Sequence, residues 1–237
     1  MSALFPLTVT GALTKRRGKV LVGPVSLTLN GQGNTVLLGP NGSGKTSMLR
    51  LLHGAARLNA GTIEWACDLQ AARQMQSFVF QRPVMLRRSV QGNLGYPLRM
   101  RGAGRKEAES LAQDWAARVG LTDMLHRPAH VLSGGEQQKL ALARALITKP
   151  GVVFLDEPCA ALDGRSTREI EGILAEAKAG GTRFVLATHD LGQARRLADE
   201  VVFLLHGKVH ETGPAEAFFA RPETQEAAAF LKGDIVE

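Results

Sequence analysis

The chain has 237 residues, of which 44% are hydrophobic and 22% charged, a composition typical of a globular protein with one sizeable core. Its formal net charge of +7 would suit a nucleic acid or an anionic membrane surface, although a solvated basic face explains the charge equally well. Two cysteines exclude a disulfide framework, and no apolar run is long enough to cross a bilayer, so we expect the chain to stay in the cytoplasm.

Short apolar runs alternate with amphipathic stretches, which predicts an α/β architecture. The predicted strands are residues 35–38, 62–65, 77–80, 152–155, 183–187 and 201–205. Several of them are continuous apolar runs, as buried parallel strands tend to be. The pattern between Arg82 and Val131 is mainly helical, and one helix face there carries Ala108, Leu111, Ala112, Trp115 and Val119. This segment is predicted to form a helical lobe inserted into the sheet domain.

A glycine-rich stretch follows the first of these strands and precedes a helix predicted over residues 45–55. A loose turn would explain the glycines alone, but their spacing before Lys45 and Thr46 fits a phosphate-binding loop. Backbone N–H groups of such a loop converge on a polyphosphate, and the helix dipole adds positive potential. The predicted nucleotide-binding residues are Gly39, Pro40, Asn41, Gly42, Ser43, Gly44, Lys45, Thr46 and Ser47.

Two carboxylates, Asp156 and Glu157, end the apolar strand within "GVVFLDEP". They could be a helix cap followed by an exposed turn. Together with the phosphate loop, however, they favour a second reading in which Asp156 holds Mg²⁺ and Glu157 polarises the water that attacks the γ-phosphate. The pattern therefore predicts a nucleotide triphosphatase.

The stretch "LSGGE" at residues 132–136 places Ser133, Gly134 and Gly135 at the start of an amphipathic helix. Capping alone would account for the serine. However, "LSGGE" resembles the signature sequence of ATP-binding-cassette (ABC) ATPases and lies between the two phosphate-site motifs, as in that family. Further matches follow the family order: Gln81 resembles the Q-loop, "AALD" at 160–163 the D-loop, and His189 the switch histidine.

The resemblance implies the fold of a P-loop NTPase of ABC type, with a mostly parallel core sheet, an N-terminal antiparallel β part and an inserted helical subdomain. It implies one ATPase domain over residues 1–237, with a RecA-like core at about 1–81 and 148–237 and a helical subdomain at about 82–147. ATP and Mg²⁺ are the expected cofactors.

Residue roles follow from the same resemblance. Lys45, Gln81, Glu157 and His189 are the expected catalytic residues, and Thr46, Gln81 and Asp156 the expected Mg²⁺ ligands. Family members pair head to tail, which implies a homodimer in which Ser133, Gly134 and Gly135 of one copy cap the γ-phosphate held by the other.

The chain departs from the family pattern at three sites. The D-loop carries Cys159 and Ala160 where many family members have threonine or phenylalanine and then serine, so a side-chain hydroxyl contact across the dimer would be missing. Glu136 stands where glutamine is common. Arg17 stands where an aromatic residue usually stacks on adenine, and we expect its guanidinium to stack instead, although Arg17 could be one more charge in an exposed basic run.

As a transport ATPase, the chain would sit at the cytoplasmic face of the cell membrane and act with a separate multi-span permease and, indirectly, an extracytoplasmic solute-binding protein. No nucleic-acid partner is expected. The C-terminal stretch is similar to the ends of ATPases that serve tungstate and related oxyanion importers. Phosphate or polar amino-acid import is the alternative, and a soluble ABC ATPase without a transport role is a further one.

The helical lobe after Gln81, which begins "RPVMLRRSV", is predicted to form the groove that accepts a cytoplasmic helix of the permease. Val84, Met85 and Leu86 would supply its apolar contacts, and Arg87 and Arg88 its rim. In the alternative reading the apolar trio is simply core of the helical lobe.

Overall fold

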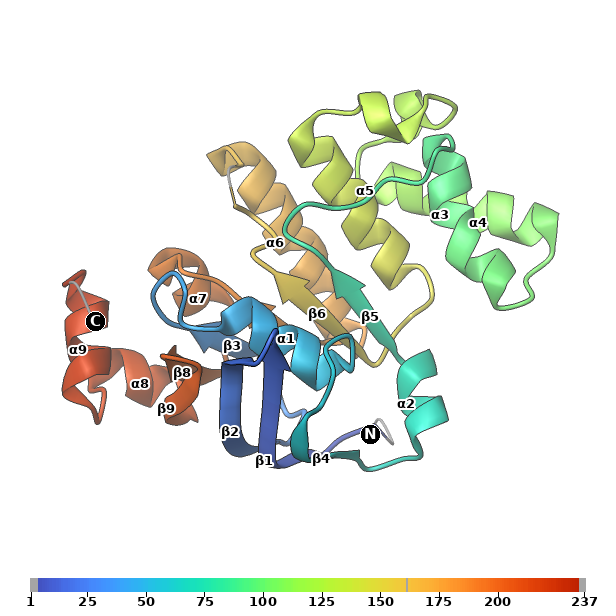
Figure 1. The fold of residues 1–237 in the computed structure, drawn as a ribbon. Helices are drawn as coiled ribbons and strands as arrows, with labels where there is room; N and C mark the ends of the chain where they lie inside the picture. Colours follow the sequence, from blue (N-terminus) through green and yellow to red (C-terminus); the bar gives the residue numbers. More distant parts are fainter. Residues whose placement is uncertain (1–3, 161, 235–237) are drawn as a thin grey trace. The chain divides into compact units, whose positions relative to one another are not determined.

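The computed structural model describes residues 4–160 and 162–234, so Ala161 of the predicted D-loop lies outside the described residues. The chain forms two compact units (Figure 1). The first comprises Met1–Gln76, Phe154–Glu157 and Arg183–Glu237, and the second comprises Ser77–Val153 and Pro158–Thr182. The subdomain boundaries that the resemblance implies stay a prediction.

The first unit contains an antiparallel sheet of three strands in the order β2-β1-β4. Its strands are β1 (Leu7–Arg16), β2 (Lys19–Leu29) and β4 (Ala60–Trp65). Buried and exposed positions alternate along much of β1, as expected for a strand with one face on a core. The register of β1 against β2 shifts between Val9 and Ala12 and again after Ala12, so the pairing is irregular.

The other sheet of the first unit has the strand order β6-β7-β3-β8-β9. These strands are β6 (Val152–Asp156), β7 (Arg183–Ala187), β3 (Thr35–Leu38), β8 (Glu200–Leu205) and β9 (Lys208–Pro214). Strand β3 runs parallel to β7 and β8, whereas β9 returns antiparallel to β8. All four residues of β3 are buried, which explains its continuous apolar sequence.

The described part of the first unit contains the helices α1 (Lys45–His53), α2 (Leu69–Gln74), α7 (Leu191–Leu197), α8 (Ala215–Ala220) and α9 (Gln225–Lys232). Helix α1 continues the chain from β3 through the glycine-rich loop. The carboxyl ends of β3, β6 and β7 each lead into one of the predicted site motifs. In open sheets with parallel strands, ligands bind at that edge.

The second unit is mostly helical. It contains α3 (Val90–Met100), α4 (Arg105–Arg118), α5 (Gly134–Leu146), α6 (Gly164–Ala179) and two short 3₁₀ helices, Thr122–Met124 and Ala129–Val131. Strand β5 (Gln76–Val79) leads into it.

The apolar face predicted for the helical lobe is confirmed. Ala108, Ala112 and Val119 are buried in a core shared with α3 and α5, and Leu111 and Trp115 pack against that core. Gly95 of α3 lies close to α4, since a Cβ there would be in ordinary contact, 3.5 Å, with the backbone oxygen of Ala108. Trp115 is therefore a packing residue.

Among the described residues, no helix combines the length and the hydropathy that a bilayer-spanning segment needs.

Candidate active site

The glycine-rich loop adopts a backbone that requires glycine. Gly39, Gly42 and Gly44 have φ angles of 149°, 82° and 103°, which side chains rarely allow. A Cβ on Gly39 would also lie 2.1 Å from the backbone oxygen of Leu204. A loop of this shape turns its backbone N–H groups inward, as a phosphate site needs.

Lys45 begins helix α1 and lies over the loop. Its Nζ donates hydrogen bonds to the backbone oxygens of Gly39 (2.8 Å) and Pro40 (3.0 Å). Burial lowers the pKa of Lys45, while the charges of Glu157 and Asp156 act in the opposite direction. The ammonium is thus held in a desolvated position, where the attraction of an anion is strong.

The polar groups around the loop fit a polyphosphate. Helix α1 has no side-chain N-cap and no acidic residue in its first turn, so its N-terminal N–H groups and dipole face an anion unopposed. The buried hydroxyl of Ser43 has no hydrogen-bond partner among the described residues. These donors, with Lys45, could hold the phosphates of ATP.

Thr46 and Asp156 meet across the site. The Thr46 hydroxyl donates a 2.7 Å hydrogen bond to Oδ1 of Asp156, which is almost fully buried. Burial raises the pKa of Asp156, and the bond from Thr46 partly opposes this shift. Paired hydroxyl and carboxylate oxygens are the kind of ligands that Mg²⁺ prefers.

Glu157 and His189 form a direct pair. His189 Nδ1 lies 3.0 Å from Oε1 of Glu157, and the backbone N–H of Glu157 donates to the oxygen of Ala187 at the end of β7. Glu157 has a φ of 47°, an uncommon conformation for a non-glycine residue and one that often marks functional sites. The backbone of β7 therefore holds the backbone of Glu157, and the carboxylate contacts His189.

The first unit thus brings together Lys45, Thr46, Asp156, Glu157 and His189. Gln81, Ser133, Gly134 and Gly135 belong to the second unit. Gln81 is exposed and follows β5. Five of the predicted site residues therefore lie on the first unit, and their roles stay predictions.

Arg17 lies at the tip of the β1–β2 hairpin. Arg17 and Gly18 have φ angles of 50° and 80°, between the paired residues Arg16 and Lys19. Two-residue turns of this kind favour asparagine, aspartate or glycine, so arginine is an unusual choice here. The side chain is exposed, and the stacking role predicted for it stays a prediction.

The signature residues cap helix α5 in a way that the sequence reading missed. Ser133 and Glu136 form a capping box, in which Oε2 of Glu136 accepts hydrogen bonds from both the backbone N–H and the hydroxyl of Ser133, each 2.8 Å long. These bonds lower the pKa of Glu136. The spacing S-x-x-E is the signal that could have revealed this pair.

The capping box borders a cavity of about 550 Å³ on the second unit. Three carboxylates, Glu136, Asp163 and Glu169, line it against the cations of Lys139 and Arg165. Lys139 and Glu169 form a 2.9 Å salt bridge. The cavity therefore combines the signature glycines with three acidic and two basic side chains.

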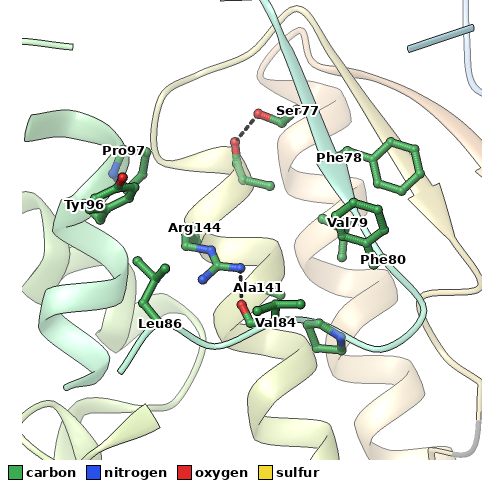
Figure 2. Close-up of a pocket in the computed structure, with 12 residues that line it drawn as sticks. Ser77, Phe78, Val79, Phe80, Val84, Leu86, Tyr96, Pro97, Ala141 and Arg144 are labelled. Carbon is green, nitrogen blue, oxygen red and sulfur yellow. Dashed lines mark hydrogen bonds between the residues drawn. The ribbon is translucent and has the colours of Figure 1, made fainter. Parts of the chain in front are cut away.

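A second cavity of the same unit, about 370 Å³ in volume, is mainly apolar (Figure 2). Val84 and Leu86 line it, together with Phe80 and Tyr96. Met85 does not line the cavity and is packed, partly buried, against the core of the helical unit, and the docking role of the three residues stays a prediction.

Comparison with known proteins identifies the family. The family model described as ABC transporter matches residues 22–160, from β2 to the residues after Glu157. The chain belongs to the ABC transporter family. It is an ABC ATPase, which couples ATP hydrolysis to transport.

Curated members of the ABC family are similar over nearly the whole chain. The phosphate import ATP-binding protein PstB 2 of Natronomonas pharaonis is 36% identical, over 97% of this chain and 87% of its own length. The tungstate uptake system ATP-binding protein TupC of Peptoclostridium acidaminophilum is 35% identical, over 90% of this chain and 99% of its own.

A solved ABC structure confirms the fold class. A dimeric, post-hydrolysis ATP-binding cassette bound to ADP and Pi superposes with a TM-score of 0.78 at 24% identity, covering 88% of this chain and 98% of that one. The predicted α/β fold, with an N-terminal antiparallel sheet, a mostly parallel core and a helical insert, is thus confirmed.

Proposed function

We propose that this chain is the ATP-hydrolysing subunit of an importer, and that Glu157 is its general base. The observation that carries the proposal is the pairing of Glu157 with His189 on the same unit as Lys45 and the Thr46–Asp156 pair. Such a group contains what γ-phosphate hydrolysis needs: an anion cradle, hard oxygen ligands and an oriented carboxylate.

Each residue then has a defined task. Lys45 exchanges its bonds to the Gly39 and Pro40 carbonyls for phosphate oxygens, which are stronger partners because they are charged. Glu157 accepts a proton from the attacking water, and His189 keeps its carboxylate in place. Thr46, Asp156 and, from the second unit, Gln81 would hold Mg²⁺, which neutralises charge on the phosphates when bound.

The subunit is proposed to work as a head-to-tail homodimer. Support comes from the signature residues, which begin the 13-residue helix α5 and border a cavity about 550 Å³ in volume. Ser133, Gly134 and Gly135 would cap the γ-phosphate held by the second copy, with the N-terminus of α5 adding its dipole.

Glu136 should weaken this cap, because the Ser133 hydroxyl has one proton and donates it to the carboxylate. A γ-phosphate must compete with Glu136 for that proton and also approach its negative charge. We expect Glu136→Gln to lower the dissociation constant of the ATP-bound dimer by roughly three- to ten-fold, measured by light scattering. Glu171→Gln on helix α6 removes an equal charge outside the cavity and should leave the dimer unchanged. Equal dissociation constants of the two variant dimers would contradict competition between Glu136 and the γ-phosphate for the Ser133 proton.

For transport, the subunit would act at the cytoplasmic face of the membrane with a multi-span permease, and indirectly with an extracytoplasmic solute-binding protein. We propose tungstate or a related oxyanion as the solute, supported by the similarity to a tungstate uptake ATP-binding protein along 99% of that protein. Phosphate has comparable support from a phosphate import ATP-binding protein, and a polar amino acid is a further alternative.

The identity of the solute can be tested in the assembled transporter. With its permease and binding protein in proteoliposomes, we expect tungstate to stimulate ATP hydrolysis more than phosphate, sulfate or glutamine does. Calorimetry on the binding protein measures the same preference directly. Tight binding of another solute, with none of tungstate, would assign the subunit to that solute and leave its ATPase role intact.

Arg17 provides a test of adenine recognition. If its guanidinium stacks on adenine, Arg17→Ala should weaken ATP binding by roughly 0.5–2 kcal/mol, and Arg17→Lys should lose part of the affinity because an ammonium is not planar. Lysine and alanine at position 17 bear similar backbone strain at this positive φ, so strain in the turn does not cause a difference in ATP affinity between the two variants. Nucleotide titrations at low and high salt measure the effect. Equal affinities of the wild type and Arg17→Lys at both salts would exclude stacking.

A further inference from the structure

The turn between β8 and β9 lies against the phosphate loop. His206 and Gly207 form this two-residue turn between the paired residues Leu205 and Lys208, with φ angles of 49° and 74°. The backbone N–H of Gly207 donates a 2.9 Å hydrogen bond to the backbone oxygen of Ser43, which belongs to the loop. The loop is therefore attached to a hairpin that is distant from it in sequence.

The same turn also holds strand β2. The backbone oxygen of Gly207 accepts a 2.7 Å hydrogen bond from the N–H of Gly23. A Cβ on Gly207 would lie 2.6 Å from the backbone oxygen of Leu21, so only glycine fits between the turn and the strand. Gly44 of the loop meets the same stretch of β2, since a Cβ there would lie 3.0 Å from Cγ2 of Val22. Gly207 thus joins the loop to β2 through both of its backbone polar groups.

These two hydrogen bonds are sheltered from water. Gly23 and Gly207 are buried, and Ser43 is only 3% exposed. A buried backbone group that loses its partner has no water to replace it, which makes such bonds costly to break. The start of the loop also rests on β8, at the close approach of Gly39 to Leu204. The end of β8 and its turn therefore support the loop at two places.

Strand β2 leads to the hairpin that is predicted to bind adenine. Its pairing with β1 starts at Lys19, next to the turn of Arg17 and Gly18, and the strand continues through Gly23. The phosphate loop and the β1–β2 hairpin are thus the expected places for the two ends of ATP. A ligand held at both ends gains affinity only when the two places keep the spacing that the ligand requires.

We propose that Gly207 is a positioning residue of the ATP site, which fixes the spacing between the phosphate loop and the β1–β2 hairpin. Phosphates bound at the loop then leave the base correctly placed at the hairpin. Gly207 acts through its backbone and is assigned no contact with the nucleotide. The inference rests on the proposed ATP site, but it depends neither on stacking by Arg17 nor on the transported solute.

Binding of ADP and of pyrophosphate separates this role from a merely structural one. ADP reaches from the loop to the hairpin, whereas pyrophosphate occupies the loop alone. We expect Gly207→Ala to reduce the ratio of the ADP affinity to the pyrophosphate affinity by roughly three- to ten-fold, measured by calorimetry on the full chain with Mg²⁺. A substitution that only loosened the loop or the fold would weaken both ligands equally. An unchanged ratio would therefore overturn the proposal.

Gly233→Ala is the matched control. Gly233 ends helix α9 with a φ of 85°, so an alanine there bears similar backbone strain, but its Cβ would meet none of the described atoms within 4 Å. This variant should keep the wild-type ratio of affinities. Equal binding of ADP and pyrophosphate to the wild type would overturn the role of Gly207. A wild type that binds neither ligand would refute the proposed ATP site itself, and this inference with it.

Hydrogen exchange in the wild type tests the same connection without a substitution. Saturating pyrophosphate should slow the exchange of the Gly23 N–H by at least about three-fold, because order in the loop would reach Gly23 through its bond to Gly207. The N–H of Ala215, which is bonded to the oxygen of Asp199, is the reference and should exchange at an unchanged rate. Unchanged exchange at Gly23 with pyrophosphate bound would overturn the proposal, even if Gly207→Ala failed to fold.

Discussion

Replacing Glu157 by glutamine should reduce ATP hydrolysis by about 10²–10⁴-fold while leaving ATP binding intact. Glutamine has nearly the same shape, and its side-chain amide can keep the contact with His189 that the carboxylate makes at 3.0 Å. It cannot accept a proton from water at neutral pH. The phosphate contacts of Lys45 and the loop do not involve this proton, so the nucleotide should still bind and close the dimer.

The variant should therefore accumulate as an ATP-bound dimer, because the closed site cannot turn over. Size-exclusion chromatography with ATP measures the dimer, and phosphate release measures the rate. Glu64→Gln, on an exposed position of β4, is the matched control and should behave as the wild type. A Glu157→Gln protein that hydrolyses ATP at a nearly normal rate would remove Glu157 from the proposed mechanism.

Buried parallel strands were the most predictable part of the fold. The predicted strand at 183–187 coincides with β7, and the strand at 201–205 differs from β8 by one residue. Their continuous apolar runs leave little ambiguity, since both faces of the sheet are covered. Local sequence did not indicate β1 and β2, whose alternation is interrupted by register shifts near Ala12 and by Gly23 and Pro24.

The site was predictable as a set of motifs but not as a set of contacts. Each motif is local, whereas the bond between His189 and Glu157 depends on how β6 and β7 align their ends. The positive φ of Glu157 has no local sequence signal, and it occurs together with a backbone bond to Ala187, a residue distant in sequence. Met85 shows the same limit in the helical unit. Within an apolar trio, sequence alone does not tell which side chain enters the core.

Charged substitutions in the apolar cavity of the helical unit should abolish transport. The proposed occupant is a cytoplasmic helix of the permease, whose apolar side chains would fill the space beside Phe80, Val84 and Tyr96. The cavity holds its shape through Arg144, which donates a hydrogen bond to the Val84 backbone oxygen (2.9 Å; Figure 2). Arg144 also donates to Oδ1 of Asn93 (3.0 Å). An anchor pocket supported in this way is typical of interface hot spots.

Val84→Asp combined with Tyr96→Asp should weaken permease binding by at least about thirty-fold, since each buried carboxylate would lose its hydration without a partner. Basal ATP hydrolysis by the free subunit should persist, because neither side chain belongs to the ATP-site residues. Pull-down on the detergent-solubilised permease and uptake in proteoliposomes measure the effect. Met100→Asp is the matched control, because Met100 is as exposed as Val84, at 69%, but does not line the cavity. Met85→Asp should instead lower the melting temperature, because Met85 packs against the core of the helical unit. A stable Val84→Asp/Tyr96→Asp double variant that still assembles with the permease and transports would place the docking surface elsewhere.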